Sequence, residues 1–435
     1  MHANPDKLLV RGLGLRNLTA NIFNYTIGSG IFVLPGIVAA ALGPPALLAY
    51  LLCAFIIGLV VLVFAEAGSR VSVTGGPYAY VEVSLGAFCG LIAGILLCVT
   101  DVAALAAIAM VLSGMIGALL HLQGMLWQSV LLTLLLGSLV AVNVRGVKSG
   151  ARLIEICTAL KLLPLFFFIV VGAFFIAPSN LHWQHVPTAS QVASTAGMLI
   201  FAFAGIEAAL LPSGEVRNPA RTVPRAAMLA LGLATIIYLL IQGVALGVLG
   251  PALGNEKLTP LAAAAGSFAG VPGRSLLLVG AGVSMFGWVT GSVLAGPRAF
   301  FALARDGFLP RRMASVHGRF HTPHVAIIAY CAIAWALALS GTFERLAILS
   351  NIAALGLYFL CAIAVVILRR RGIRTDAEPF RIPGGLLVPI LACISITWVV
   401  IETITRREFI AFGITLAIAV VGYVLKKRAE PLEAR

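Results

Sequence analysis

Charged side chains are scarce in this sequence. Only 11% of its 435 residues are Asp, Glu, Lys or Arg, whereas 60% are hydrophobic. Soluble domains usually carry about 25% charged residues, so the composition excludes an ordinary soluble protein. A membrane-spanning helix needs about 20 apolar residues, and the length accommodates about twelve such helices joined by short loops. Little of the chain is left for a separate soluble domain.

Signatures of catalysis and of metal binding are also missing. The seven cysteines lie in or beside apolar runs without paired spacing, which is typical of small buried side chains and not of disulfides or a metal site. The seven histidines fall in predicted loops or at span edges. No phosphate-binding or dinucleotide-binding glycine motif is present. We therefore expect no enzymatic activity, no cofactor, no metal and no ATP-driven step.

Basic residues outnumber acidic ones, 30 to 16, which gives a net charge of +14. Their distribution argues against a nucleic-acid partner, because all but six of them fall in predicted loops on one side of the membrane. The exceptions are Lys161, inside a span, and five residues on the other side: Lys257, Arg274, Arg345, Arg406 and Arg407. Such asymmetry follows the positive-inside rule. We expect a multi-pass protein of the cell membrane with both termini cytoplasmic.

Two apolar runs contain what looks like a deliberate interruption of a helix. The first is Gly28–Phe32 and the second is Phe201–Glu207, and each has a proline seven residues after its glycine, at Pro35 and Pro212. Within a bilayer, unwound backbone is tolerated only where it is buried in protein or lines a cavity. A pair of interrupted spans is typical of a transporter's binding site. The alternative is that the glycines only allow close helix packing.

The spacing of the two interruptions predicts an internal repeat. Gly28 and Gly205 lie 177 positions apart, an interval that holds five spans, so the second copy enters the membrane in the opposite orientation. We expect an all-α membrane protein with a first five-helix repeat in residues 1–180 and an inverted second repeat in 181–372. Residues 373–435 would form two further helices and a cytoplasmic tail.

Three charged residues lie well inside predicted spans: Asp101, Lys161 and Glu207. Placing each of them inside the membrane costs at least ~2.5–3.5 kcal/mol on insertion scales, so each is a candidate functional or structural residue. Glu207 either takes up a proton, holds the unwound segment, or is a structural carboxylate. Lys161 either donates to carbonyls freed by the first interruption, as a tethered cation, or releases a proton during the cycle, or snorkels to the interface. Asp101 either attracts a cationic group in a cavity or pairs with Lys161 or with backbone.

The interruptions themselves indicate a type of ligand. A half-helix that starts near Ser29, Gly30 and Ile31 presents free N–H groups, which favour a carboxylate. A half-helix that ends near Phe203 and Ala204 presents free carbonyls to an ammonium group. Together these two ends describe a receptor for an α-amino acid. Phe201, one turn before the second interruption, either closes over the substrate or packs as an ordinary aromatic residue.

The sequence resembles the amino acid–polyamine–organocation transporters over nearly its whole length. The resemblance rests on seven segments in order: N-Y-T-I-G-S-G-I-F (24–32), G-G-P-Y-A-Y (75–80), L-G-A-F-C-G (85–90), C-T-A-L-K-L-L-P (157–164), F-A-F-A-G-I-E (201–207), E-V-R-N-P-A-R-T-V-P (215–224) and A-R-D-G-F-L-P (304–310). It implies the LeuT-like fold, in which two inverted five-helix repeats with two broken helices enclose one site, plus two C-terminal helices.

The resemblance also implies roles for individual residues. The N–H groups of Ser29, Gly30 and Ile31 would bind the substrate carboxylate. The amino group would be bound by the carbonyls of four residues: Thr26, Ile27, Phe201 and Ala204. Gly28 and Phe203 complete the predicted binding segments. Phe201 would be the gating aromatic, Lys161 the fifth-helix lysine of many members, and Asp101 a residue of the side-chain pocket.

We therefore expect a secondary transporter that moves amino acids across the cell membrane by alternating access, as a proton-coupled symporter or an exchanger. One alternative is an antiporter of cationic amino acids or polyamines that uses Asp101. Another, of a different class, is a membrane amino acid sensor or a channel that does not concentrate its ligand. Bound sodium is disfavoured because Lys161 would compete with it. We expect no partner subunit.

Overall fold

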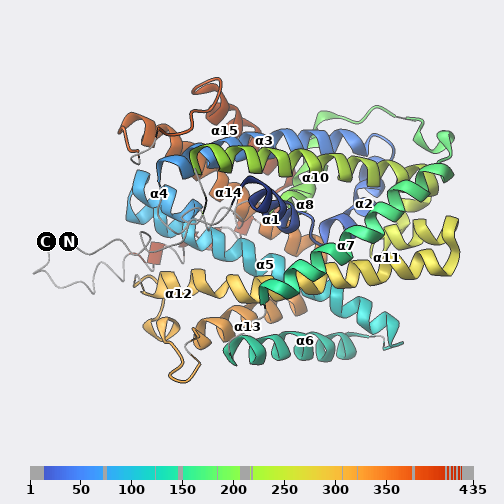
Figure 1. Cartoon of the computed structure of the whole chain (residues 1–435), viewed down its shortest axis with the longest axis horizontal. Coiled ribbons are helices and arrows are strands. Elements are labelled where there is room, and N and C mark those ends of the chain that lie inside the picture. The colour runs from blue at the N-terminus through green and yellow to red at the C-terminus, as the bar shows by residue number, and fades with distance from the viewer. Residues whose placement is uncertain are drawn as a thin grey trace, which may run out of the picture. The chain divides into compact units, whose positions relative to one another are not determined.

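The computed structural model describes residues 14–71, 76–122, 124–145, 150–183, 185–205, 216, 219–305, 307–320, 322–374 and 378–406, together with scattered positions between 409 and 423. Helices make up most of this part of the chain (Figure 1). The α-helices are α1 Leu15–Thr26, α2 Gly30–Leu42, α3 Ala46–Arg70, α4 Pro77–Leu85, α5 Ala87–Leu119, α6 Met125–Arg145, α7 Gly150–Gly172, α8 Ala189–Phe203, α10 Pro219–Leu249, α11 Pro260–Ala295, α12 Pro297–Arg305, α13 His324–Ser340, α14 Phe343–Arg370 and α15 Leu387–Thr403. Short 3₁₀ helices are η2 Ala173–Phe175, η3 Pro178–Leu181, η5 Gly250–Asn255 and η6 Arg311–Ala314.

Many of these helices are suited to a lipid environment. Six helical stretches in the described residues are long and apolar enough to cross a membrane, by length and composition: those that contain α3, α5, α6, α10, α11 and α14. Shorter apolar helices include α2, α8, α13 and α15. The prediction of a helical, multi-pass membrane protein is thereby confirmed. The exact number of spans, the 5+5 repeat and the cytoplasmic termini stay predictions.

Local sequence sets where several helices begin and end. Helix α8 starts with a reciprocal capping box, in which Thr188 and Gln191 satisfy each other's backbone N–H groups. Helix α4 starts with Pro77 at its first turn, where the missing N–H costs nothing. Gly270 has a φ of +61° and divides α11 into two helical pieces, because only glycine adopts that backbone conformation at little cost.

The described helices group into two compact units. The first unit comprises the chain up to Ala93, Phe167–Arg274 and Ala354–Thr403, and the second comprises Gly94–Phe166, Ser275–Ala353 and the remaining C-terminal residues. Each unit therefore takes helices from both halves of the sequence. This division follows packing, whereas the predicted boundaries at 180 and 372 follow a repeat in the sequence, so those boundaries stay a prediction.

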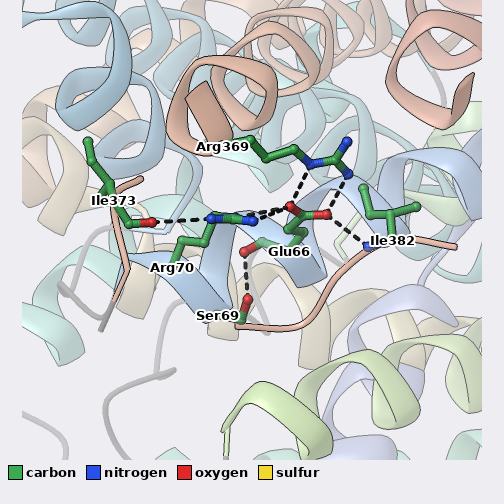
Figure 2. A network of polar contacts seen from close by, with 6 residues as sticks. All are labelled: Glu66, Ser69, Arg70, Arg369, Ile373 and Ile382. Carbon is green, nitrogen blue, oxygen red and sulfur yellow. Dashed lines mark hydrogen bonds and ion pairs between the residues drawn. The ribbon is translucent and has the colours of Figure 1, made fainter. Parts of the chain in front are cut away.

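A buried ion network ties together three segments of the first unit. Glu66 on α3 is 0% exposed, and its carboxylate accepts hydrogen bonds from Arg70 Nε (3.0 Å) and from Arg369 Nε and Nη2 (2.7 and 2.6 Å). The same carboxylate accepts from the Ile382 backbone N–H at 2.9 Å, and Arg70 Nη1 donates to the Ile373 carbonyl at 3.3 Å. Figure 2 shows the carboxylate between the two guanidinium groups. The network fixes α3, the end of α14 and both sides of the α14–α15 connection to one another.

Candidate functional site

The first apolar run is interrupted between α1 and α2. Helix α1 ends at Thr26, Ile27 leaves the helical region with φ −79° and ψ 78°, and α2 begins at Gly30. Within the interruption the Gly28 N–H donates to the Thr26 carbonyl at 2.9 Å, and the Phe32 N–H donates to the Ser29 carbonyl at 3.0 Å. The helix therefore stops and restarts at the glycines that the sequence singled out.

The start of α2 carries polar groups that lack partners. Ser29 is the residue before the helix, where a serine hydroxyl usually caps the first turn, yet its side chain makes no capping bond. It is 1% exposed, and its hydroxyl has no hydrogen-bond partner among the residues that the structure describes. Among the described residues, the backbone N–H groups of Ser29, Gly30 and Ile31 also make no hydrogen bond. Three amides and one hydroxyl are thus available at the positive end of a helix.

The second apolar run is interrupted where α8 ends at Phe203. The Ala204 N–H still donates to the Ile200 carbonyl at 2.8 Å, but Ala204 itself is extended, with φ −64° and ψ 155°. Gly205 follows with a φ of +106°, a conformation that favours glycine. In the described part of the chain no donor reaches the Ala204 carbonyl. Residues 206–215, and with them the predicted coupling residue Glu207, lie outside the described residues.

The two interruptions lie directly against each other. A Cβ atom added to Gly30 would lie 2.9 Å from Ala202 Cα, and one added to Gly205 would lie 2.9 Å from the Tyr25 carbonyl oxygen. Neither position has room for a side chain, because such a contact is shorter than real Cβ atoms make. Both interpretations of the glycines therefore hold at once: they accompany helix ends, and they allow two backbones to approach closely.

A tyrosine on α10 bridges the two helix ends. Tyr238 is 0% exposed, and its hydroxyl oxygen lies 2.8 Å from the Thr26 carbonyl and 2.7 Å from the Ala202 carbonyl. Its single proton serves one of these carbonyls at a time. The Phe203 ring packs edge-on against the Tyr238 ring, with centroids 5.0 Å apart. Sequence reasoning missed Tyr238, whose only signal was a polar aromatic residue inside an apolar span.

The other predicted residues of the first unit are also placed. The Thr26 hydroxyl donates back to the Ile22 carbonyl at 2.9 Å, within α1. The Thr26 carbonyl already accepts from the Gly28 N–H, and it shares the single proton of Tyr238 with the Ala202 carbonyl. Phe201 is buried at 8% exposed, in the last turn of α8.

Asp101 and Lys161 belong to the second unit. The Asp101 main-chain carbonyl accepts from the Tyr330 hydroxyl at 3.3 Å, and the Tyr330 hydroxyl lies 2.6 Å from the Ser292 hydroxyl. Lys161 on α7 is 5% exposed, which does not fit a lysine that snorkels to the interface. The predicted roles of both residues in binding and coupling stay predictions.

The described residues offer no group of three or more His, Cys, Asp or Glu side chains arranged to hold a metal ion. What the geometry does offer is a positive helix start beside a helix end that presents a carbonyl.

Comparison with known proteins identifies the family of this chain. Residues 13–425 match the model of the family described as amino acid permease. The chain belongs to the amino acid permease family. Its members are transport proteins and not enzymes, which confirms the resemblance to the amino acid–polyamine–organocation transporters.

Several curated relatives of this permease cover nearly the whole chain. The branched-chain amino acid permease BcaP of Bacillus subtilis is 29% identical over 97% of the chain and 94% of its own length. The serine/threonine exchanger SteT of the same organism is 30% identical over 98% of the chain and 99% of its own length. The methylthioribose transporter of that organism is 28% identical over 99% and 96%.

Proposed function

We propose that this permease is a secondary transporter that binds a neutral α-amino acid at the two helix interruptions and carries it across the cell membrane by alternating access. The observation that carries the proposal is the buried Ser29 hydroxyl, which has no partner in the described part of the chain and lies beside three backbone amides that make no hydrogen bond there. A buried polar group without a partner costs about 1–3 kcal/mol. A ligand carboxylate would satisfy all of these groups at once.

The carboxylate accordingly occupies the start of α2. Backbone N–H groups and the helix dipole both favour an anion at this end, and the Ser29 hydroxyl adds a donor. Ser29, Gly30 and Ile31 therefore form the carboxylate receptor. The close approach of Gly30 to Ala202 brings this receptor next to the end of α8.

The amino group occupies the carbonyl end of α8. The Ala204 carbonyl has no donor in the described residues, so it is the natural acceptor for an ammonium N–H. The Ile27 and Phe201 carbonyls are the remaining candidates. The Thr26 carbonyl is the least suited of the expected four, because it already accepts from the Gly28 N–H and is also within reach of the Tyr238 hydroxyl.

Transport follows if substrate binds the two exposure states unequally, since binding shifts an equilibrium only through a difference in affinity. Phe201 closes over the bound amino acid. Movement of the two inverted repeats then opens the site to the opposite side of the membrane. Coupling uses either protons, through Lys161 and Glu207, or obligatory exchange. Both termini lie in the cytoplasm, as the distribution of basic residues requires.

The substrate class is inferred from relatives. BcaP is named for branched-chain amino acids and SteT for serine and threonine, and both kinds of side chain are uncharged. L-leucine and L-threonine are therefore the first substrates to test. The second candidate function, antiport of cationic amino acids or polyamines, rests on Asp101 in α5. Binding of arginine or putrescine to the purified protein, together with no binding of leucine or threonine, would favour this second function.

Replacement of Ser29 by alanine tests the proposal. In proteoliposomes, uptake of labelled L-leucine or L-threonine by the Ser29→Ala variant should show a KM raised about tenfold, because one hydrogen bond to a charged group is lost. The maximal rate should change little, since the bond stabilises the substrate-bound ground state and the transition state of transport equally.

A matched control removes a buried hydroxyl that has its own partners. Ser84 is 0% exposed and its hydroxyl donates within α4, to the Tyr80 or Val81 carbonyl. Ser84→Ala should therefore leave the KM within about twofold of the native value. If Ser29→Ala behaves like Ser84→Ala, the carboxylate is not bound at the start of α2.

A further inference from the structure

A glutamine on α10 contacts α2 one helical turn beyond Tyr238. Gln242 is 0% exposed, and its side-chain Nε2 lies 3.3 Å from the carbonyl oxygen of Pro35 on α2. Its Oε1 lies 3.1 Å from the hydroxyl of Tyr50 on α3, which is itself 1% exposed. All three elements involved, α2, α3 and α10, belong to the first unit.

The chemistry of these groups fixes the direction of each hydrogen bond. A carbonyl oxygen only accepts, so the amide nitrogen of Gln242 faces Pro35 and donates to it. The amide oxygen then faces Tyr50, and the Tyr50 hydroxyl must donate to it. The orientation of the Gln242 amide therefore depends on both of its partners, Pro35 and Tyr50.

Pro35 is the point of α2 where a side-chain contact matters most. Proline has no N–H, so α2 lacks the backbone bond that would run to the carbonyl of Ile31, a residue of the proposed carboxylate receptor. A helix rises about 1.5 Å per residue, which places Pro35 about 7.5 Å along α2 from Gly30. On the next residue, Gly36, the backbone packs directly against the carbonyl of Glu256, the residue that follows η5. Contacts with η5, with α8 and with α10 together set the position of this short helix.

We propose that Gln242, oriented by Tyr50, is a positioning residue that holds α2 so that the amides of Ser29 to Ile31 converge on the substrate carboxylate. The inference rests on the proposed function. Residues four apart lie on the same face of a helix, so one face of α10 contacts α1 and α8 through Tyr238 and α2 through Gln242. That face sets the separation of the carboxylate and ammonium receptors.

The test compares an amino acid with the analogue that lacks only its carboxylate. Binding of L-leucine and of L-leucinol, and of L-threonine and L-threoninol, is measured by competition on the purified protein. Native protein should prefer each amino acid to its alcohol. Gln242→Met, which keeps the length of the side chain and loses both hydrogen bonds, should reduce that preference about tenfold. Tyr50→Phe, which removes a single hydroxyl, should shift the preference in the same direction.

Asn143→Leu is the matched control, because Asn143 is a buried amide on α6 that donates to the Leu139 carbonyl of its own helix. It should leave the preference unchanged. If Gln242→Met and Tyr50→Phe weaken acid and alcohol equally, the positioning role is wrong while the proposed function stands. If Gln242→Met does not fold, Tyr50→Phe decides alone. If native protein does not prefer the amino acids, the proposed function falls and this inference falls with it.

Discussion

A few buried polar groups carry the chemistry of the candidate site. Among the described residues the Ser29 hydroxyl has no partner, whereas the Tyr238 hydroxyl reaches two carbonyls, one at the end of α1 and one at the end of α8. The first group is suited to a ligand and the second to holding the protein in shape. Ser29 therefore contributes to affinity for the ligand, and Tyr238 holds the two helix ends in position.

Removal of the Tyr238 hydroxyl tests whether the position of the two helix ends affects affinity for the amino acid. Tyr238→Phe keeps the ring that packs on Phe203 but leaves the Thr26 and Ala202 carbonyls without their common donor. We expect affinity for the amino acid to fall about fivefold to tenfold, with a small change in melting temperature. Competition binding and thermal unfolding measure the two effects.

Thr195→Val provides the comparison, because Thr195 is a buried hydroxyl on α8 that donates within its own helix, to Gln191. That variant should bind normally. Equal affinities for native protein and Tyr238→Phe would show that the two helix ends keep their separation without the tyrosine.

The sequence predicted the interruptions and could not predict what holds them. Glycines within apolar runs mark a helix end by local chemistry, and α1 does end at Thr26 and α8 at Phe203. Tyr50 and Gln242 gave no such signal, because each is a single polar residue in an apolar span and its partner lies far away in the chain. Which long-range partner a buried polar residue finds depends on tertiary packing, and no periodicity in one sequence records it.

At the scale of elements, α15 is part of the first unit and not an appendage. The Ser190 hydroxyl at the start of α8 donates to Glu402 on α15, and Gly197 of α8 packs directly against Thr403. The Glu66 network fixes the connection that leads into α15. The sequence had placed Arg70 and Arg369 among the loop charges of the inner side, because charge counting by loops does not reveal a buried pair.

Neutralisation of Glu66 should destabilise this arrangement. Glu66→Gln keeps the size of the side chain but leaves the Arg70 and Arg369 guanidinium groups close together without the charge that balances them. Loss of one partner of a buried ion pair costs about 3–5 kcal/mol, so thermal unfolding of the purified protein should shift down by several degrees. Glu402→Gln, at a partly exposed contact, should shift it much less. Equal melting temperatures for Glu66→Gln and native protein would contradict a stabilising role.

At the scale of the molecule, both compact units draw helices from both halves of the chain. Such mixing is expected if the halves are inverted repeats, because helices at matching positions of two repeats then pack together. Helices α5, α7, α11 and α14 each contribute residues to both units.

The central claim is that this chain moves an amino acid across the membrane and concentrates it. Uptake of labelled L-leucine and L-threonine into proteoliposomes tests it most directly, with an imposed proton gradient or with unlabelled amino acid inside. The account predicts that label accumulates inside above its external concentration, and that Ser29→Ala needs more substrate to reach the same rate. Label that only equilibrates, as through a channel, or that binds without entering, as with a sensor, would contradict it.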